Sequence, residues 1–471
     1  MKRTMLIQAL AVCFVLCMRP SLWALSTITV TVEDASRLKA EIVNANGRDP
    51  QKYHTLIYLK AGTYFVKDIA PIRRNIRIVG VDASSTIISG AKDCVKDDQA
   101  LLPGGLEFNP SDDNVKYEQC LGNSDTGSFF FGDRHTLFRV DPGGFLWLER
   151  VTIRDGMSTG IGGGGIHNEG TLMVNVSTVM HNFTNWGGGG GIYNSGTLYV
   201  YDSTIRQNFA RSADGGGIYN DRGGYVEISH STISDNVGGC AGGIFNGNST
   251  SPGSNGGPLA ITNSTISNNK VIAKVNGAGC ESSVNEGISA GGILSFGSYE
   301  AWLKNVTITE NVNFTSGSTS TGGVAGGPRG TLGGIYPLNT LIANNYKSGL
   351  AKEASECYGF VNSAGGNFIG NKTGSRSSCV IINFNKPQQA DVLNEADPRL
   401  GKLRDNGGNT CTHGLLPGSK AILGGWPKGS PGGYELDEYD QRWVERLDKS
   451  DIGAYAFSSY PPLLGLACTS K

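Results

Sequence analysis

The chain has 471 residues, 69 of them glycine, and a formal net charge of −1 at pH 7, with acidic and basic residues interspersed. The absence of a basic stretch excludes a nucleic-acid-binding protein, and the lack of a Gly-x-y period excludes a collagen. This glycine content is typical of a chain that turns tightly many times.

Residues 1–25 are predicted to be an export signal. A basic start precedes an apolar run from Met5 to Met18, and Ala24 offers a small residue for cleavage. The run is short for a membrane span, and no other stretch is apolar enough to cross a bilayer. We therefore expect a secreted, extracellular or cell-surface protein, monomeric and without a transmembrane segment.

Residues 26–70 are predicted to form an N-terminal cap of α/β structure. Residues 27–32 alternate like a half-buried strand, Asp34 can N-cap a helix over Arg37–Val43, and Leu56–Leu59 is a further strand. A solenoid exposes apolar core at its ends, so a cap of this kind is expected wherever a solenoid begins.

The segment from Gly162 to Asn311 repeats one pattern five times. Each copy has a tripeptide such as Ser203-Thr204-Ile205, and an asparagine stands five residues after its first member. These asparagines are Asn182, Asn208, Asn236, Asn269 and Asn311. In four copies a glycine run ends in Ile-x-Asn, and the isoleucines are spaced by 26 residues. A fixed period in the twenties, with short alternating strands, predicts a solenoid.

The alternation within each copy predicts an all-β fold, a right-handed single-stranded parallel β-helix over residues 71–345. Aliphatic residues five and three positions before each tripeptide should point inward, and the position between them outward. That outward position holds Met173, Tyr199, Glu227, Ala260 and Trp302. The asparagines should stack into a structural ladder that bonds the backbone of the turns. A loop over about residues 91–133 interrupts the coils.

Eight cysteines remain once the signal is removed, an even number suited to disulfides in an oxidising compartment. Near neighbours in a solenoid sequence are near in space, so pairing of neighbours is the first choice among 105 connectivities. The expected pairs are Cys94–Cys120, Cys240–Cys280, Cys357–Cys379 and Cys411–Cys468. A metal site is the alternative, but no Cys-x-x-Cys spacing supports it.

Residues 346–395 are predicted to be irregular, and residues 396–471 to form a β-rich C-terminal cap. The tail, with Asp397-Pro398-Arg399-Leu400 and Asp451-Ile452-Gly453-Ala454-Tyr455, resembles the end of choice-of-anchor Q domain proteins in the pectin-lyase-like superfamily. Residues 37–46 resemble the start of that group, although Ala35-Ser36 lacks its usual cysteine. The Gly-Gly-Ile repeats also resemble polymorphic outer-membrane proteins. The resemblance implies the fold and export, and it implies no particular activity.

Four rings could form an aromatic strip. His167, Tyr193, Tyr219 and Phe245 each fall between the isoleucine and the asparagine of Ile-x-Asn, so alternation turns them outward as a candidate ligand-binding surface. The alternative is an internal stack, because bending at the adjacent glycines makes the alternation uncertain.

Polysaccharide cleavage needs either paired carboxylates or a base placed beside a carboxylate of the substrate. Candidate groups stand outside a common repeat face: Asp97-Asp98, Asp112-Asp113 and His413. The bases Arg154, Arg206 and Lys304 lie near repeat strands without an accompanying acidic column. The catalytic residues are therefore unknown.

Modification and cofactor sites give little more. Asn248, Asn313 and Asn371 are the better glycosylation candidates among the sequons. No cofactor or metal is predicted, although the acids between Glu435 and Asp451 could hold calcium. The prediction is an exported, non-catalytic, adhesin-like β-helix protein of the surface or matrix that binds polysaccharide or a cell-surface partner. The alternative is a polysaccharide lyase or glycoside hydrolase of the pectin-lyase-like superfamily.

Overall fold

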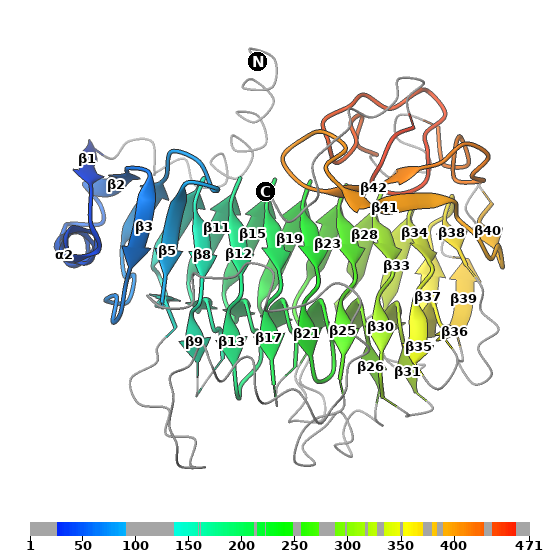
Figure 1. The fold of residues 1–471 in the computed structure, drawn as a ribbon, viewed down its shortest axis with the longest axis horizontal. Coiled ribbons are helices and arrows are strands. Elements are labelled where there is room, and N and C mark those ends of the chain that lie inside the picture. Colours follow the sequence, from blue (N-terminus) through cyan, green and yellow to red (C-terminus); the bar gives the residue numbers. More distant parts are fainter. Residues whose placement is uncertain are drawn as a thin grey trace.

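The computed structural model describes residues 26–90, 136–158, 160, 162–211, 214–221, 223–247, 256–272, 288–296, 299–315, 319–326, 334–348, 352–370, 379–383, 390–427 and 436–457. These residues are nearly all in strands and turns. Figure 1 shows the strands stacked side by side along the long axis of the molecule, with the helix α2 (Ala35–Asn46) at one end. The predicted parallel β-helix is confirmed.

Two long parallel sheets, A and B, form walls of the solenoid. Sheet A contains β1 (Ser26–Val32), β2 (Tyr53–Leu59), β4 (Asn75–Val79), β7 (Phe145–Glu149), β11 (Thr171–Asn175), β15 (Thr197–Tyr201), β19 (Tyr225–Ser229), β23 (Leu259–Thr262), β28 (Ala301–Lys304), β33 (Ile335–Leu338), β37 (Cys357–Ser363) and β39 (Cys379–Asn383). Sheet B contains β3 (Gly62–Phe65), β5 (Thr86–Ser89), β8 (Thr152–Arg154), β12 (Thr178–Met180), β16 (Thr204–Arg206), β20 (Thr232–Ser234), β24 (Thr265–Ser267), β29 (Thr307–Thr309), β34 (Leu341–Ala343), β38 (Phe368–Ile369) and β40 (Val392–Leu393).

Sheets C and D complete each coil. Sheet C contains β6 (Phe138–Val140), β10 (Ile166–Asn168), β14 (Ile192–Asn194), β18 (Ile218–Asn220), β22 (Ile244–Asn246), β27 (Ile293–Ser295) and β32 (Val324–Gly326), and it joins sheet A at β37. Sheet D contains β9 (Met157–Ser158), β13 (Phe183–Thr184), β17 (Phe209–Ala210), β21 (Val237–Gly238), β25 (Lys270–Val271), β30 (Val312–Asn313), β35 (Tyr346–Ser348) and the antiparallel β36 (Lys352–Ala354). A short pair, β26 (Ser289–Ala290) and β31 (Ser320–Thr321), lies beside them.

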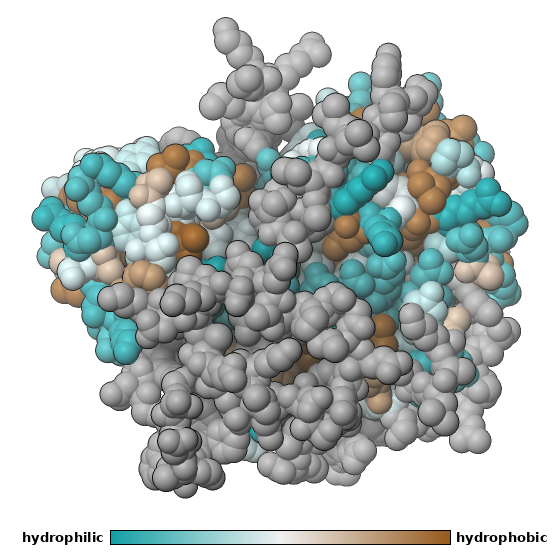
Figure 2. Space-filling model, in the orientation of Figure 1, coloured by the Kyte–Doolittle hydropathy of each residue, from teal (hydrophilic) through white to brown (hydrophobic). Residues whose placement is uncertain are grey.

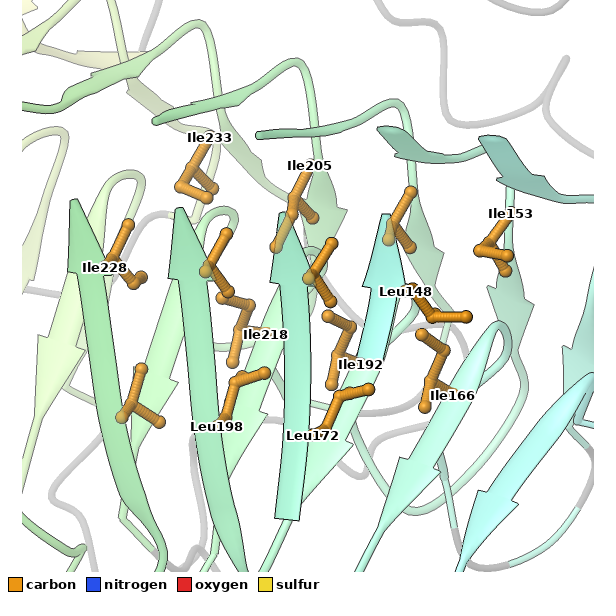
Figure 3. Packing of buried hydrophobic residues seen from close by; sticks show 14 of the residues in the cluster. Leu148, Ile153, Ile166, Leu172, Ile192, Leu198, Ile205, Ile218, Ile228 and Ile233 are labelled. Carbon is orange, nitrogen blue, oxygen red and sulfur yellow. The ribbon is translucent and has the colours of Figure 1, made fainter. Parts of the chain in front are cut away.

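The core consists of aliphatic columns, because each coil lies in register over the preceding one. Val174 pairs with Val200, and Val200 pairs with Ile228. In Figure 3 the columns from sheets A, B and C converge on one interior, and all their labelled side chains are fully buried. Each such side chain stabilises the fold by about 1.5–3 kcal/mol, so the columns supply most of the driving force for folding.

Left-handed residues turn the chain at both ends of the sheet-B strands from β8 to β34. Before the strand stand residues such as Val176 (φ 46°) and Asp202 (φ 47°), and after it residues such as Gln207 (φ 54°). A β-branched residue such as Val176 rarely adopts this conformation. Serines hold the first bend: the Ser177 hydroxyl donates to the Asn175 carbonyl at 2.8 Å, and the Ser177 amide donates to Ser203 Oγ at 3.0 Å.

The predicted asparagine ladder is present and buried. The side-chain nitrogen Nδ2 of Asn182 donates to Asn208 Oδ1 at 3.0 Å, and the same contact repeats in the next coils at 2.9–3.0 Å. The ladder continues beyond the predicted members to Asn345 and ends on a carboxyl, that of Glu356. A second ladder, Asn168–Asn194–Asn220–Asn246, runs along sheet C with steps of 2.6–2.8 Å.

The Glu356 carboxyl closes the first ladder. Its Oε2 accepts hydrogen bonds from the Asn345 side chain at 2.7 Å and from the Asn345 backbone at 3.1 Å. Burial raises the pKa of this carboxyl to about 8, although the bonds to Asn345 oppose the shift. The carboxyl therefore keeps its proton in the folded chain at pH values where it is ionised in the unfolded chain.

We expect this proton to make stability depend on pH. The folded pKa is raised above the unfolded value of 4.5, so the stabilisation is complete below that pH and is lost as the pH rises towards 8. Glu356→Gln keeps an oxygen acceptor and cannot ionise. Relative to wild type, it should raise the free energy of unfolding increasingly with pH, by up to about 5 kcal/mol. Urea unfolding at a series of pH values measures this, with exposed Glu33→Gln as control; a difference that is constant with pH would contradict it.

The N-terminal cap forms as predicted. Asp34 N-caps α2 and accepts from the Arg37 amide at 2.9 Å, and the helix ends at Gly47. Leu38, Ile42 and Ala45 on its inner face are buried against the first coils. At 12 residues α2 is short, and in the described part of the chain no helix is long and apolar enough to cross a membrane.

Residues 346–395 correct the prediction of an irregular segment. The solenoid continues through β35–β40, and β37 pairs with β39 over five residues. The predicted disulfide Cys357–Cys379 joins these two strands, with 5.3 Å between the Cα atoms. The coils were not recognised because β37 runs from sheet C into sheet A as one continuous strand, so the spacing of the earlier repeats is lost.

The C-terminal segment, residues 396–457, is a second correction, because it does not lie over the end of the solenoid. Figure 1 shows it, in orange and red, along the flank beside β23–β38, while β40 lies at the end. Its regular structure among the described residues is one antiparallel hairpin, β41 (Leu400–Arg404) and β42 (Thr412–Leu415), with isolated bridges. In Figure 2 hydrophobic and hydrophilic residues are interspersed over this segment.

Candidate functional site

The outer face of sheet A carries aromatic side chains in one column. Leu198 and Val200 of β15 point into the core, so Tyr199 between them points outward, as predicted. The strand registers place its equivalents in line with it. This outer column runs Trp147, Met173, Tyr199, Glu227, Ala260, Trp302 and Tyr336.

Three tyrosines surround one carboxylate at the middle of this face, and we name Tyr199, Tyr201, Tyr225 and Glu227 the tyrosine cluster. The Tyr201 hydroxyl donates to Glu227 Oε1 and the Tyr225 hydroxyl donates to Glu227 Oε2, both at 2.8 Å. The Tyr199 ring lies 6.0 Å from the Tyr201 ring and 5.9 Å from the Tyr225 ring. Tyr199, Tyr225 and Glu227 are partly exposed, while Tyr201 is buried.

The electrostatics of the tyrosine cluster favour hydrogen bonding over proton transfer. Burial, together with the Glu227 carboxylate, raises the pKa of Tyr201 and of Tyr225 above the ordinary tyrosine value. Both hydroxyls therefore stay protonated and act as donors. A carboxylate has about four lone-pair sites, and the two tyrosines occupy two of them. Glu227 keeps capacity to accept further hydrogen bonds.

A second group of rings, which we name the Trp302–Tyr336 pair, lies further along the outer column. The Trp302 and Tyr336 rings are 5.0 Å apart, and Trp302 Nε1 donates to Glu300 Oε2 at 2.7 Å. Ala260 occupies the column between Glu227 and Trp302. Alanine has the smallest side chain in this part of the column, between the two groups of rings.

The N-terminal end of the outer column is occupied by an ion pair. The Arg77 guanidinium lies 3.7 Å from the Trp147 ring centroid and pairs with Glu149. Trp147 and Met173 are buried, unlike Tyr199. The accessible part of the column therefore begins at β15.

The predicted strip on sheet C is not an open surface. The four rings lie outside the aliphatic core and stack with centroids 4.5, 5.6 and 5.1 Å apart. His167 is 3% exposed, Tyr219 6% and Phe245 0%, and Tyr193 alone among the four is partly exposed. The glycine-rich turns explain the burial, because a Cβ at Gly188 would lie 2.5 Å from the Tyr219 ring. The outward orientation was right, and the expected accessibility was wrong.

The outer face of sheet B is occupied by the C-terminal segment. The Thr232 hydroxyl donates to the Cys411 carbonyl, and the Thr265 hydroxyl donates to Gln441 Oε1, both at 2.6 Å. The Gln441 side-chain nitrogen donates in turn to Ser231 O at 3.0 Å. Further along, the Ala454 amide donates to Thr307 Oγ1 at 2.9 Å. These contacts join the segment to three successive coils, those of β20, β24 and β29.

His413 lies on this face, whereas the sequence placed it away from the repeats. Its Nδ1 donates to the Gly401 carbonyl, so the neutral ring accepts from Ser267 Oγ through Nε2, each at 2.8 Å. Burial lowers the pKa of His413. A serine beside an oriented histidine has the geometry of an activated nucleophile, but Ser267 is 0% exposed and His413 1%. A substrate has no access to this pair, which attaches the segment to the sheet.

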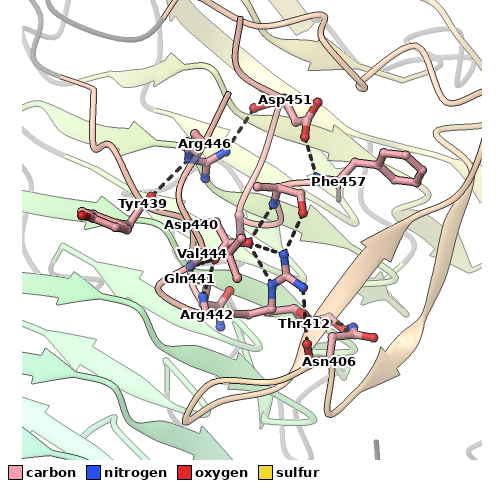
Figure 4. Close-up of polar contacts among 12 residues, drawn as sticks. Asn406, Thr412, Tyr439, Asp440, Gln441, Arg442, Val444, Arg446, Asp451 and Phe457 are labelled. Atoms are coloured by element: carbon pink, nitrogen blue, oxygen red, sulfur yellow. Dashed lines mark hydrogen bonds and ion pairs between the residues drawn. The ribbon is translucent and has the colours of Figure 1, made fainter. Parts of the chain in front are cut away.

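A buried ionic network holds the C-terminal segment together (Figure 4). Arg442 donates to Asp440 Oδ2 through Nη2 at 2.6 Å and through Nε at 2.8 Å, and its guanidinium lies 3.7 Å from the Tyr455 ring centroid. Arg446 Nη2 donates to Asn263 Oδ1 at 3.1 Å, which links the network to the solenoid.

A ring stack extends the same attachment towards the N-terminus. Trp443 stacks on His230 at 3.8 Å and donates from Nε1 to Asp202 at 2.8 Å. Burial lowers the pKa of His230 to about 3 and raises the pKa of Asp202 to about 6. At pH 7 His230 is therefore neutral, whereas Asp202 becomes protonated as the pH falls below about 6.

Two of the acids considered for calcium are used within this network. Asp440 accepts from Arg442, and Asp451 accepts from the Leu423 amide at 2.7 Å. Among the described residues there is no group of three or more acidic, histidine or cysteine side chains arranged to hold a metal. Glu435 lies outside the described residues.

The catalytic candidates are not brought together. Asp97-Asp98 and Asp112-Asp113 lie outside the described residues. Arg154 pairs with Asp155 at 2.8 Å, Arg206 donates to Gln207 at 3.1 Å, and Lys304 lies on a different sheet from both.

Some of the residues predicted for glycosylation and disulfides are described by the structure, and others are not. Asn313 is fully buried and donates to Ser289 Oγ at 2.9 Å, so it is a wrong candidate for glycosylation. Asn248 and Asn371 lie outside the described residues, as do four predicted disulfide cysteines: Cys94, Cys120, Cys280 and Cys468. Cys240 and Cys411 each take part in a disulfide.

Comparisons with known proteins concern the fold alone. No family model matches the chain, and no curated protein matches it in sequence. Among solved structures it is similar to the pectate lyase Pel9A, with 13% identity and a TM-score of 0.47 over 92% of this chain and 98% of that one. It is also similar to the pectin methylesterase PemA from Erwinia chrysanthemi, with 13% identity and a TM-score of 0.33 over 75% of this chain and 94% of that one.

The tyrosine cluster and the Trp302–Tyr336 pair were not recognised from the sequence as candidate binding residues. The sequence placed Tyr199, Glu227 and Trp302 at one outward position, and that was the available signal. Tyr201 and Tyr225 stand two residues to either side of the outer column and contribute through Glu227. The alternation that turns Tyr199 and Glu227 outward also turns Tyr201 and Tyr225 outward, and this was the signal for the two residues.

Proposed function

We propose that the chain is an exported, non-catalytic β-helix protein, adhesin-like, that binds carbohydrate through the outer face of sheet A. The observation that carries the proposal is the line of partly exposed rings and carboxylates from Tyr199 to Trp302. Aromatic rings pack on the apolar faces of sugars while neighbouring acceptors bind sugar hydroxyls. The motifs that resemble choice-of-anchor Q domain proteins support export to a surface or matrix.

A lyase or hydrolase remains the competing function. It would need a pair of accessible catalytic groups, and the Ser267–His413 pair is buried. On sheet A the hydroxyls of Tyr201 and Tyr225 are protonated, and both donate to the Glu227 carboxylate. This arrangement supports binding.

The test is binding and turnover measured on the same glycan panel. Wild type should bind at least one polysaccharide in affinity electrophoresis without releasing reducing ends or unsaturated products. Tyr225→Ala/Trp302→Ala should weaken that binding at least tenfold, about 1.4 kcal/mol. Tyr58→Ala, an exposed ring of β2 on the same face, should bind like wild type. Turnover by the wild type would refute the non-catalytic role, and equal binding by the double variant would refute the site.

A further inference from the structure

The charges on the outer face of sheet A distinguish between classes of glycan. From β15 to β33, two carboxylates, Glu227 and Glu300, contact the rings directly. The described outward side chains of these strands include one cation, Lys304, and its charge acts on Asp437 of the C-terminal segment. Burial raises the pKa of Asp437, and the charges of Arg446 and Lys304 oppose that rise. No arginine stands on these described strands. The part of this face that carries the rings is therefore negatively polarised.

A negatively polarised face selects against acidic chains. A polyuronate presents one carboxylate on each sugar and needs cations along its path, whereas Glu227 would repel it. A neutral sugar presents hydroxyl donors, and the Glu227 carboxylate retains lone pairs beyond its bonds to Tyr201 and Tyr225.

The register of the strands sets a direction for the ligand. Tyr199, Glu227, Ala260 and Trp302 stand on adjacent parallel strands, β15, β19, β23 and β28. At about 4.8 Å between neighbouring strands, the line from Tyr199 to Trp302 is roughly 14 Å long and follows the solenoid axis. A linear chain of several sugars that contacts both groups of rings would pass over the small side chain of Ala260.

We propose that the outer face of sheet A between β15 and β28 binds an uncharged polysaccharide chain that lies along the solenoid axis. Glu227 accepts hydrogen bonds from the sugar hydroxyls, and the rings of Tyr199, Tyr225 and Trp302 pack on the sugar faces. This inference rests on the proposed carbohydrate binding and specifies its ligand.

The test compares neutral and acidic chains on the full-length protein. In affinity electrophoresis at low salt, neutral β-glucan or xylan should retard the wild type, and polygalacturonate should not. Ala260→Gln places a longer side chain between the two groups of rings and should raise the Kd for neutral chains at least tenfold. Glu227→Gln, which keeps the shape and removes the charge, should weaken neutral binding and lessen the discrimination against polygalacturonate. Tyr58→Ala is the matched control, and thermal unfolding confirms that each variant is folded.

The outcomes separate the two proposals. Retardation by polygalacturonate and not by neutral chains overturns the neutral ligand and leaves carbohydrate binding in place. Neutral binding that is unchanged in Ala260→Gln and in Glu227→Gln overturns the location along β15–β28. Retardation by no glycan, or binding to a basic protein alone, overturns the proposed function together with this inference.

Discussion

Asn236→Ala is expected to destabilise the protein by about 4 kcal/mol, because several buried polar groups lose their partners at once. The Asn236 side chain donates to Ile205 O at 2.9 Å and to Asn269 Oδ1 at 3.0 Å. It also accepts from the backbone and the side chain of Asn208, each at 3.0 Å. Alanine supplies none of these bonds, and water has no access to replace them.

Chemical denaturation of Asn236→Ala beside Asn175→Ala measures this effect. Asn175 lies at the end of a sheet-A strand, and no side-chain hydrogen bond to it is found among the described residues. Asn175→Ala should change stability by less than about 1 kcal/mol. If the two variants unfold at the same denaturant concentration, the ladder contributes no more than an asparagine without side-chain hydrogen bonds, contrary to our expectation.

Asp440→Ala should release the C-terminal segment from the flank of the solenoid. Asp440 is fully buried and accepts from Arg442 through both oxygens, from the Val444 amide at 2.9 Å and from the Ala456 amide at 2.9 Å. Removing one partner of a buried ion pair costs about 3–5 kcal/mol, because the remaining charge stays buried without compensation. The segment, rather than the coils, bears this loss.

Limited proteolysis is the direct measurement for Asp440→Ala. Cleavage within residues 396–457 should accelerate by at least a hundredfold, while fragments containing the coils before Asp202 keep wild-type resistance. Asp448→Ala removes an exposed carboxylate of the same segment and serves as control. Equal cleavage rates in the two variants would show that the Asp440–Arg442 pair does not hold the segment.

The coils could be predicted because their contacts repeat at a nearly constant interval. Ile166, Ile192 and Ile218 are separated in sequence by the length of one coil, so the sequence itself reveals which side chains stack. The same regularity predicted the asparagine ladder and the outward position of Tyr199. The end of the asparagine ladder on Glu356 was not predicted, since a glutamate at the end of a column of asparagines is not part of the repeat.

The C-terminal segment could not be placed from sequence, because its contacts do not repeat. Gln441 meets Ser231 and Thr232 across more than two hundred residues, and no periodicity connects them. Accessibility was the second failure. Alternation correctly turned Tyr219 outward, but the backbone of Gly188 lies against its ring, and alternation carries no information about what covers a face.

The path of the C-terminal segment also has a consequence for how the molecule unfolds. In a simple solenoid each coil touches its neighbours alone, so the structure can open one coil at a time from either end. Here Trp443 contacts Asp202 while Ser450 contacts Asn339, and the residues between them bind intervening coils. Coils from β16 to β34 are therefore coupled into one cooperative unit, whereas those before β16 can fray from the N-terminal end independently. The solenoid should behave as two parts of unequal cooperativity, with hydrogen exchange slowest where the segment lies.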